Sequence, residues 1–119
     1  MDKRDIDKIE GIIKDRDYSQ NYFVDNHSKV YESFLEMAKH TFTSNKLERK
    51  VKELIAVGIA IVAANEPMIE RHIHHALEHG ARYDEVLEAV EVGIETGGAQ
   101  AAVAARFAIK VIEYYQVKI

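Results

Sequence analysis

Glu53 and His72 are the two residues best suited to catalysis in this chain of 119 residues. Histidine titrates near neutral pH and a carboxylate can orient it, so a Glu–His pair is a workable general acid–base unit. His72 falls in the apolar arc of a predicted helix, and Glu53 lies near the start of the preceding, mostly apolar helix. Because these helices are joined almost directly at Asn65, we expect the two side chains to meet. The alternative is a core histidine whose ring is satisfied by a carbonyl or carboxylate.

Three histidines share one face of the predicted helix, at i, i+3 and i+7: His72, His75 and His79. The i, i+4 spacing of His75 and His79 can clamp a cation. The remaining histidine is expected to face solvent with two glutamates: His74, Glu70 and Glu78. The HExxH motif is absent and no second cluster supplies further ligands. We therefore interpret His75 and His79 as surface histidines and predict no metal and no cofactor.

Arg106 is a cation set among the alanines of a predicted helix near the end of the chain. A guanidinium group matches the geometry of a carboxylate, so Arg106 is the candidate contact for a substrate carboxylate. The alternative is a salt bridge to a neighbouring residue or to a second subunit. The sequence does not indicate a cysteine or serine nucleophile, because it has no cysteine and no serine in a Gly-x-Ser-x-Gly elbow.

The single proline and the weak strand signals predict an all-α chain. An amphipathic N-terminal helix is expected to break near Gly11 or after Asp17, and residues 41–45 form a polar linker. Asn65 and Asp84 are candidate N-caps, and Gly80 and the Gly97-Gly98 pair are candidate terminators. The five later helical regions are expected at about 22–40, 48–64, 65–80, 84–97 and 99–115.

Apolar periodicity predicts which faces of these helices are buried. The second helical region has the stripe Val30, Phe34, Leu35, Met37 and Ala38, and the fifth has Val86, Leu87, Val90 and Ile94. The third is apolar all round in its second half, which is typical of a helix buried within a fold or an oligomer. Alanines cover several faces of the last helix, so other helices can approach it closely. In so short a chain we interpret this as subunit packing.

Composition bounds the class of protein. The length indicates one domain, and the net charge of −4 argues against a general nucleic-acid binder. The longest apolar stretch, residues 54–64, is too short for a membrane span of about 20 residues. Residues 1–6 include four charged side chains and lack the apolar run of a secretory signal. The default expectation is therefore a cytoplasmic protein.

Residues 47–112 resemble the carboxymuconolactone decarboxylase family, which includes the alkylhydroperoxidase D-like proteins. Four segments carry the resemblance by their order and spacing: 47–55, 65–80, 84–89 and 97–106. The resemblance implies one domain over residues 1–119, with a helical extension at about 1–45 and the family core at about 47–112. It also implies an all-α fold of about six helices around an antiparallel helix pair, and assembly into homotrimers or hexamers.

The hydroperoxidase-type branch of that family uses a Cys-x-x-Cys pair with an upstream glutamate and a following histidine. Glu53 and His72 match the glutamate and the histidine, whereas Asn65 and Met68 stand in place of the cysteines and Pro67 replaces a frequent further histidine. Neither asparagine nor methionine can supply the thiolate that peroxide reduction requires. The chain is therefore not expected to be a thiol peroxidase.

The decarboxylase-type branch also lacks the cysteines, and His72 and Arg106 match positions of that branch. The resemblance implies a lyase or decarboxylase-type acid–base enzyme acting on a small carboxylated molecule. His72 would transfer the proton, Glu53 would orient it, and Arg106 would contact the anion. Pro67 and Met68 depart from the polar pattern of that branch, which puts its particular substrate in question. The rival hypothesis is a non-catalytic binding or structural oligomer that kept the fold.

Overall fold

The protein is all-α, as predicted. A computed structural model describes residues 1–118, which form six helices and no strand. In chain order these are α1 (Lys3–Asp25), α2 (Lys29–Phe42), α3 (Arg49–Val62), α4 (Glu66–Glu78), α5 (Tyr83–Gly97) and α6 (Ala99–Lys118). Among the described helices, none is both long and apolar enough to cross a membrane.

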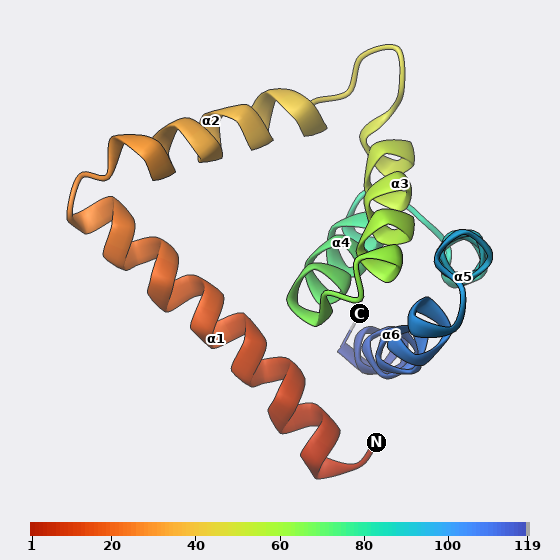
Figure 1. Ribbon diagram of the computed structural model, residues 1–119. Helices are drawn as coiled ribbons and strands as arrows, with labels where there is room; N and C mark the ends of the chain where they lie inside the picture. Colours follow the sequence, from red (N-terminus) through yellow and green to blue (C-terminus); the bar gives the residue numbers. More distant parts are fainter. Residues whose placement is uncertain (119) are drawn as a thin grey trace.

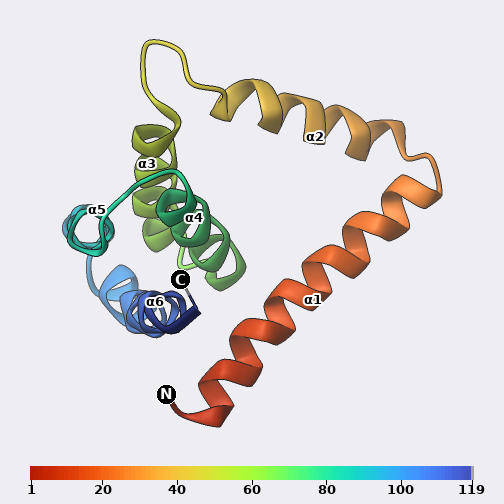
Figure 2. The ribbon, with the colours of Figure 1, turned by 180° about the vertical axis from the view of Figure 1, so that it is seen from behind.

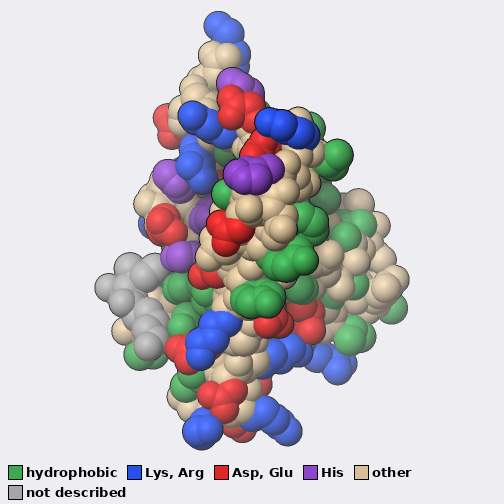
Figure 3. Space-filling model, turned by 90° about the vertical axis from the view of Figure 1, so that its left-hand side faces the viewer, with side chains coloured by type: hydrophobic (Ala, Val, Ile, Leu, Met, Phe, Trp, Pro, Cys, Tyr) green, Lys and Arg blue, Asp and Glu red, His purple; other side chains and the backbone are tan. Residues whose placement is uncertain are grey.

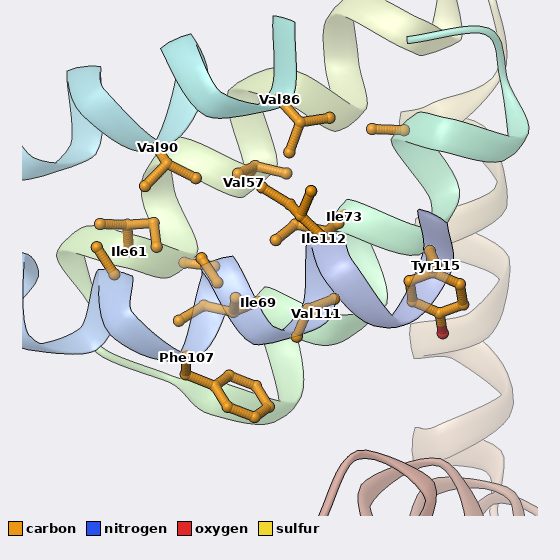
Figure 4. Close-up of a cluster of buried hydrophobic side chains, with 14 of the residues drawn as sticks. Val57, Ile61, Ile69, Ile73, Val86, Val90, Phe107, Val111, Ile112 and Tyr115 are labelled. Carbon is orange, nitrogen blue, oxygen red and sulfur yellow. The ribbon is translucent and has the colours of Figure 1, made fainter. Parts of the chain in front are cut away.

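The hydrophobic core lies between α3, α4, α5 and α6. Figure 4 shows side chains from all four helices converging there, among them Val57, Ile61, Ile69, Ile73, Val86, Val90, Val111 and Ile112. Each helix contributes residues three or four positions apart, the spacing that places side chains on one helical face. This packing holds α3 and α4 as a rigid pair, on which Glu53 and His72 lie.

A tight turn joins α3 to α4 and sets their antiparallel arrangement. Ala64 adopts a left-handed conformation with φ 53°, and the side-chain oxygen of Asn65 accepts a hydrogen bond of 3.0 Å from the backbone N–H of Met68. Pro67 lies in the first turn, where its missing N–H leaves no helical hydrogen bond unmade. The predicted capping role of Asn65 is confirmed, and Gly80, with φ 99°, follows the end of α4 as expected.

The first two helices form an open arm beside this body (Figures 1 and 2). The predicted break near Gly11 or Asp17 is wrong, because α1 continues through both to Asp25. A helical glycine costs only about 1 kcal/mol, which the buried side chain of Ile9 offsets by packing on the body. The predicted second helix at 22–40 is likewise wrong at its start. It begins after Ser28, whose hydroxyl caps the helix by accepting a 3.1 Å hydrogen bond from the N–H of Tyr31.

Most of the stripe predicted to be buried on α2 is exposed in the single chain, while Leu35 and Ala38 are partly buried. Val30, Phe34 and Met37 are 84%, 49% and 59% exposed, and no residue of α2 is buried. The reason is that α2 spans the arm and reaches the body only near its C-terminal end. Figure 3 views the molecule from the side of this arm, where hydrophobic side chains lie exposed among charged ones.

Two predictions for α5 also need correction. Asp84 is not its N-cap, because the helix begins at Tyr83 after Arg82, whose backbone N–H donates a 2.9 Å hydrogen bond to Glu85. Leu87 is 42% exposed and lies outside the buried stripe that includes Val86 and Val90. The predicted end of α5 is confirmed, since Gly98, with φ 76°, terminates the helix, whereas α3 ends at Val62 rather than at residue 64 and α6 continues past residue 115 to Lys118.

Candidate functional site

Glu53 and His72 meet across the α3–α4 pair. Nδ1 of His72 lies 2.8 Å from Oε1 of Glu53, a buried hydrogen-bonding distance between residues on antiparallel helices. Glu53 is fully buried and His72 is 8% exposed. A carboxylate can only accept a hydrogen bond, so Nδ1 carries the hydrogen and Nε2 is the ring nitrogen left to exchange a proton. The predicted contact is therefore present, and its catalytic role remains a prediction.

Two further residues hold the Glu53 carboxylate. Nε of Arg49 donates a 3.2 Å hydrogen bond to Oε2, and Nδ1 of His75 lies 3.6 Å from the same oxygen. Burial by itself raises the pKa of Glu53, but the hydrogen bonds and charges of His72 and His75 outweigh it and lower the pKa to about 2. Glu53 is thus a fixed negative charge that orients its partners.

His75 is more than the surface histidine that its place at the edge of the helical wheel predicted. Its side chain is only partly exposed and reaches Glu53 one turn after His72. His79, in contrast, is exposed and lies outside this group. The i, i+3 spacing from His72 to His75 indicated that the two rings share a helical face. It did not reveal that the Glu53 carboxylate contacts both rings.

Phe42 covers the other side of the His72 ring. The two rings stack with centroids 5.4 Å apart and an interplanar angle of 29°. Phe42 is the last residue of α2, so the arm contributes directly to the surroundings of the pair. Sequence patterns gave no sign of this contact because thirty positions separate the two residues and their helices are not consecutive.

A cavity of about 450 Å³ opens onto the pair. Its lining combines residues of α2, α3 and α4: Leu35, Ala38, Lys39, Phe42, Thr43, Arg49, Glu53, Arg71, His72 and His75. Three cations line it against one carboxylate, and that carboxylate is already paired. The cavity therefore favours an anionic occupant.

Arg71 is a cation of this cavity whose guanidinium group is available to a ligand. It is partly buried, and no carboxylate pairs with it in the described part of the chain. It also lines a neighbouring hollow of about 320 Å³ together with His74 and His75. Sequence reasoning missed Arg71 because consecutive residues of a helix point about 100° apart, so the helical wheel does not place its side chain beside that of His72.

Arg106, the sequence-predicted substrate contact, lies elsewhere. Its side chain is exposed on α6 and is not among the residues that line the cavity beside His72. Within one chain, therefore, the structure brings Glu53 and His72 together and leaves Arg106 apart. Its proposed role in substrate binding remains an untested prediction.

The expected solvent-facing position is wrong for Glu70 and holds only in part for His74, whose side chain is 36% exposed. Glu70 is fully buried, with Oε1 2.7 Å from the guanidinium of Arg16, and its Oε2 accepts a hydrogen bond from the hydroxyl of Tyr115. The ring of His74 stacks on Tyr115 with centroids 4.4 Å apart. The long helix α1 and the end of α6 cover this side of α4, which an isolated helical wheel cannot reveal.

The positions of the family's cysteines serve other purposes here. Asn65 caps α4, and Met68 is 39% exposed; neither lines the cavity. Glu53, His72 and His75 are the described residues whose donor atoms could hold a metal ion, all lying within 4.8 Å of one another.

Comparisons with known proteins agree with the fold and with the earlier resemblance. The profile of the Carboxymuconolactone decarboxylase family matches residues 28–110. "Uncharacterized protein 4 in cox locus" of Paracoccus denitrificans is 30% identical over 86 residues, which is 72% of this chain and 78% of that protein. An uncharacterized protein of Cupriavidus necator is also 30% identical, over 70% of this chain and 71% of its own length.

Two solved structures have the same fold as this chain. A carboxymuconolactone decarboxylase family protein from Legionella pneumophila superimposes with a TM-score of 0.86 at 25% identity, over 92% of this chain and 97% of that one. The protein TM1620 of Thermotoga maritima gives a TM-score of 0.85 at 19% identity, over 92% and 96% of the two chains, and supports the fold alone.

Proposed function

Because the chain belongs to the carboxymuconolactone decarboxylase family, we propose that it is an acid–base enzyme of the lyase or decarboxylase type acting on a small carboxylated molecule. The observation that carries the proposal is the buried Glu53–His72 pair beside a cavity with excess positive charge. Thiol-based peroxide reduction is excluded, because the chain contains no cysteine.

In such a reaction Glu53 would position His72, and His72 would transfer the proton. Glu53 fixes the ring of His72 through Nδ1, while Nε2 exchanges the proton. In a decarboxylation the bond between carbon and carboxylate breaks, carbon dioxide leaves, and the electron pair remains on carbon. His72 then delivers a proton to that carbon.

Arg71 and Lys39 support the binding of the substrate's carboxylates. Arg71 offers a planar set of donors that matches a carboxylate, and Lys39 adds charge at the cavity edge. Phe42 excludes water from one face of His72, which strengthens the electrostatic interactions of the pair.

Ligand binding by chelator-treated protein tests this proposal. A panel of small di- and tricarboxylates, including carboxylated lactones, is titrated by calorimetry, and carbon dioxide release is measured for those that bind. We expect Arg71→Gln to weaken binding at least about tenfold, the effect of losing roughly 1.5–3 kcal/mol from a charged hydrogen bond.

Arg106→Gln is the matched comparison, since it removes the same group from α6. Unchanged binding by Arg106→Gln together with a loss in Arg71→Gln supports the cavity as the site. The reverse result would place the anion at Arg106, and binding by none of the panel would contradict the proposed substrate class.

Assembly and location complete the proposal. A groove of about 560 Å³ between α3 and α5 is lined almost entirely by apolar side chains, of which Ile55 and Ile59 are 50% and 59% exposed. Such a surface supports burial against a second copy of the chain, in a homo-oligomer that we propose to be a trimer or hexamer. The cytoplasm remains the expected location.

A further inference from the structure

Glu53, His72 and His75 form a compact set of donor atoms that the sequence did not predict as a metal site. Spacing along α4 gave two histidines one turn apart, and the tertiary structure adds the carboxylate from α3 that the pattern lacked. Two imidazoles with one carboxylate are a donor set that divalent transition-metal ions favour. Ca²⁺ and Mg²⁺, which prefer oxygen ligands, fit it poorly.

The distances between these atoms suit a shared ion. Donors at about 2.1 Å from one ion lie roughly 3.0–3.4 Å apart, for angles between a right angle and the tetrahedral one. Here Nδ1 of His72 lies 2.8 Å from Oε1 of Glu53 and Nδ1 of His75 lies 3.6 Å from Oε2, and one donor atom of each residue lies within 4.8 Å of the other two. A shared ion would draw the three donor atoms closer together through side-chain rotation.

The surroundings also suit such a site. Arg49 donates to Oε2 of Glu53, which leaves Oε1 for the ion, and coordinating carboxylates commonly keep a hydrogen-bonding partner of this kind. Glu53 is fully buried, so it is held in place before any ion arrives. The cavity beside the three residues leaves room for a water molecule or an anion at the remaining coordination positions.

Positive charge nearby sets a limit on affinity. Arg49 and Arg71 both line the cavity and repel a cation, so the site should be weaker than a closed structural zinc site. The same charges would attract an anion to a bound ion. A metal ion here is therefore expected to keep an open, ligand-accessible position.

We propose that Glu53, His72 and His75 bind one divalent transition-metal ion of the Zn²⁺ class. The ion takes the place of the hydrogen that joins Nδ1 of His72 to Glu53. Proton transfer by the Glu53–His72 pair and metal binding consequently exclude each other. This inference goes beyond the proposed enzymatic function, since it requires neither a carboxylated substrate nor turnover.

Calorimetric titration of the chelator-treated full chain with ZnCl₂ tests the inference, with Co²⁺ absorption in the visible range reporting nitrogen ligation. We expect saturable binding of one ion per chain, weakened at least about tenfold in His75→Gln. His75→Gln is the informative variant because the contact between Glu53 and His72 stays in place. Circular dichroism and thermal melting establish that each variant is folded.

Two histidines on the same helix provide matched controls. His79 is exposed and outside the cluster, and His74 forms a separate contact of 2.9 Å with Glu78. His79→Gln and His74→Gln should bind Zn²⁺ as the unmodified chain does. Absence of saturable binding would overturn the inference, and so would binding that survives His75→Gln or is lost in either control. The carboxylate titrations are run with chelator, so failure of one proposal leaves the other standing.

Discussion

The imidazole of His72 and the carboxylate of Glu53 lie 2.8 Å apart although 19 residues separate them in the chain. The α3–α4 turn at Ala64 and Asn65 brings the two helices into antiparallel contact and so creates the pair. Arg49, His75 and Phe42 then surround it. Each of these contacts gives a measurable consequence.

His72→Gln should strongly slow turnover of a substrate identified by the carboxylate screen and leave the fold largely intact. Glutamine keeps a hydrogen-bond donor toward Glu53 but cannot exchange a proton near neutral pH. Loss of a general acid–base group typically lowers the rate by about 10²–10⁴-fold. Steady-state kinetics and thermal melting measure the two effects. Full activity would refute the role given to His72, whereas a lowered melting temperature with no activity in either protein would favour the non-catalytic alternative.

Acid should remove the stabilising contribution of Glu53 over a defined pH range. Its pKa falls from 4.5 to about 2 on folding, so below pH 4.5 the unfolded chain takes up the proton more readily than the folded one. The contribution is therefore complete above about pH 4.5 and is lost as the pH falls toward about 2. Urea unfolding of chelator-treated protein and of Glu53→Gln, followed across this range, measures the effect. The two stability curves should converge in acid, and parallel curves would show that Glu53 is not responsible.

Gly93→Ala should destabilise the protein by about 1–3 kcal/mol, because it overfills the contact between α3 and α5. A Cβ at Gly93 would lie 2.7 Å from Cβ of Ile61 and 2.8 Å from the carbonyl oxygen of Gly58. Gly11→Ala is the matched control, since a Cβ there meets nothing within 4 Å in a helix of the same chain. It should be neutral or stabilising by up to about 1 kcal/mol. Denaturant unfolding compares them, and equal effects would contradict the close packing.

Tyr115→Phe should lower the free energy of unfolding by about 1–3 kcal/mol, since it removes a donor from a fully buried carboxylate. Tyr18, which is 74% exposed, provides the control, and Tyr18→Phe should change stability by less than about 0.5 kcal/mol. Chemical denaturation of both variants distinguishes a buried cluster of α1, α4 and α6 from a loosely attached arm. Equal stability of the two variants would indicate the latter.

Ile59→Glu should disrupt the proposed oligomer. The side chain is 59% exposed in the single chain and lines the apolar groove, where a charge would be buried without a partner on assembly. Light scattering at micromolar concentration should show a trimer or hexamer for the unmodified chain and a mass closer to one chain for the variant. Lys14→Glu, on the exposed surface of α1 outside the groove, should assemble normally. A monomeric unmodified chain would contradict the assembly itself.

The sequence by itself determined the features that depend on local periodicity and local hydrogen bonding. The single proline and the weak strand signals predicted an all-α chain, and cap residues placed the junction at Asn65 and the end of α5 at Gly98 correctly. The absence of cysteine excluded thiol chemistry, and the family resemblance selected Glu53 and His72. Where a local signal was missed, as at the Ser28 cap, the start of the helix was missed as well.

Only the tertiary structure decided what each helical face meets. A helical wheel gives the direction of a side chain but not the element opposite it, because that depends on contacts between residues distant in the chain. This is why Glu70, expected in solvent, is buried against Arg16 and Tyr115, and why most of the apolar stripe of α2 is exposed. The same reason explains the site: packing of α2, α3 and α4 places Arg71 beside His72, supplies His75 with a carboxylate, and leaves Arg106 on another surface.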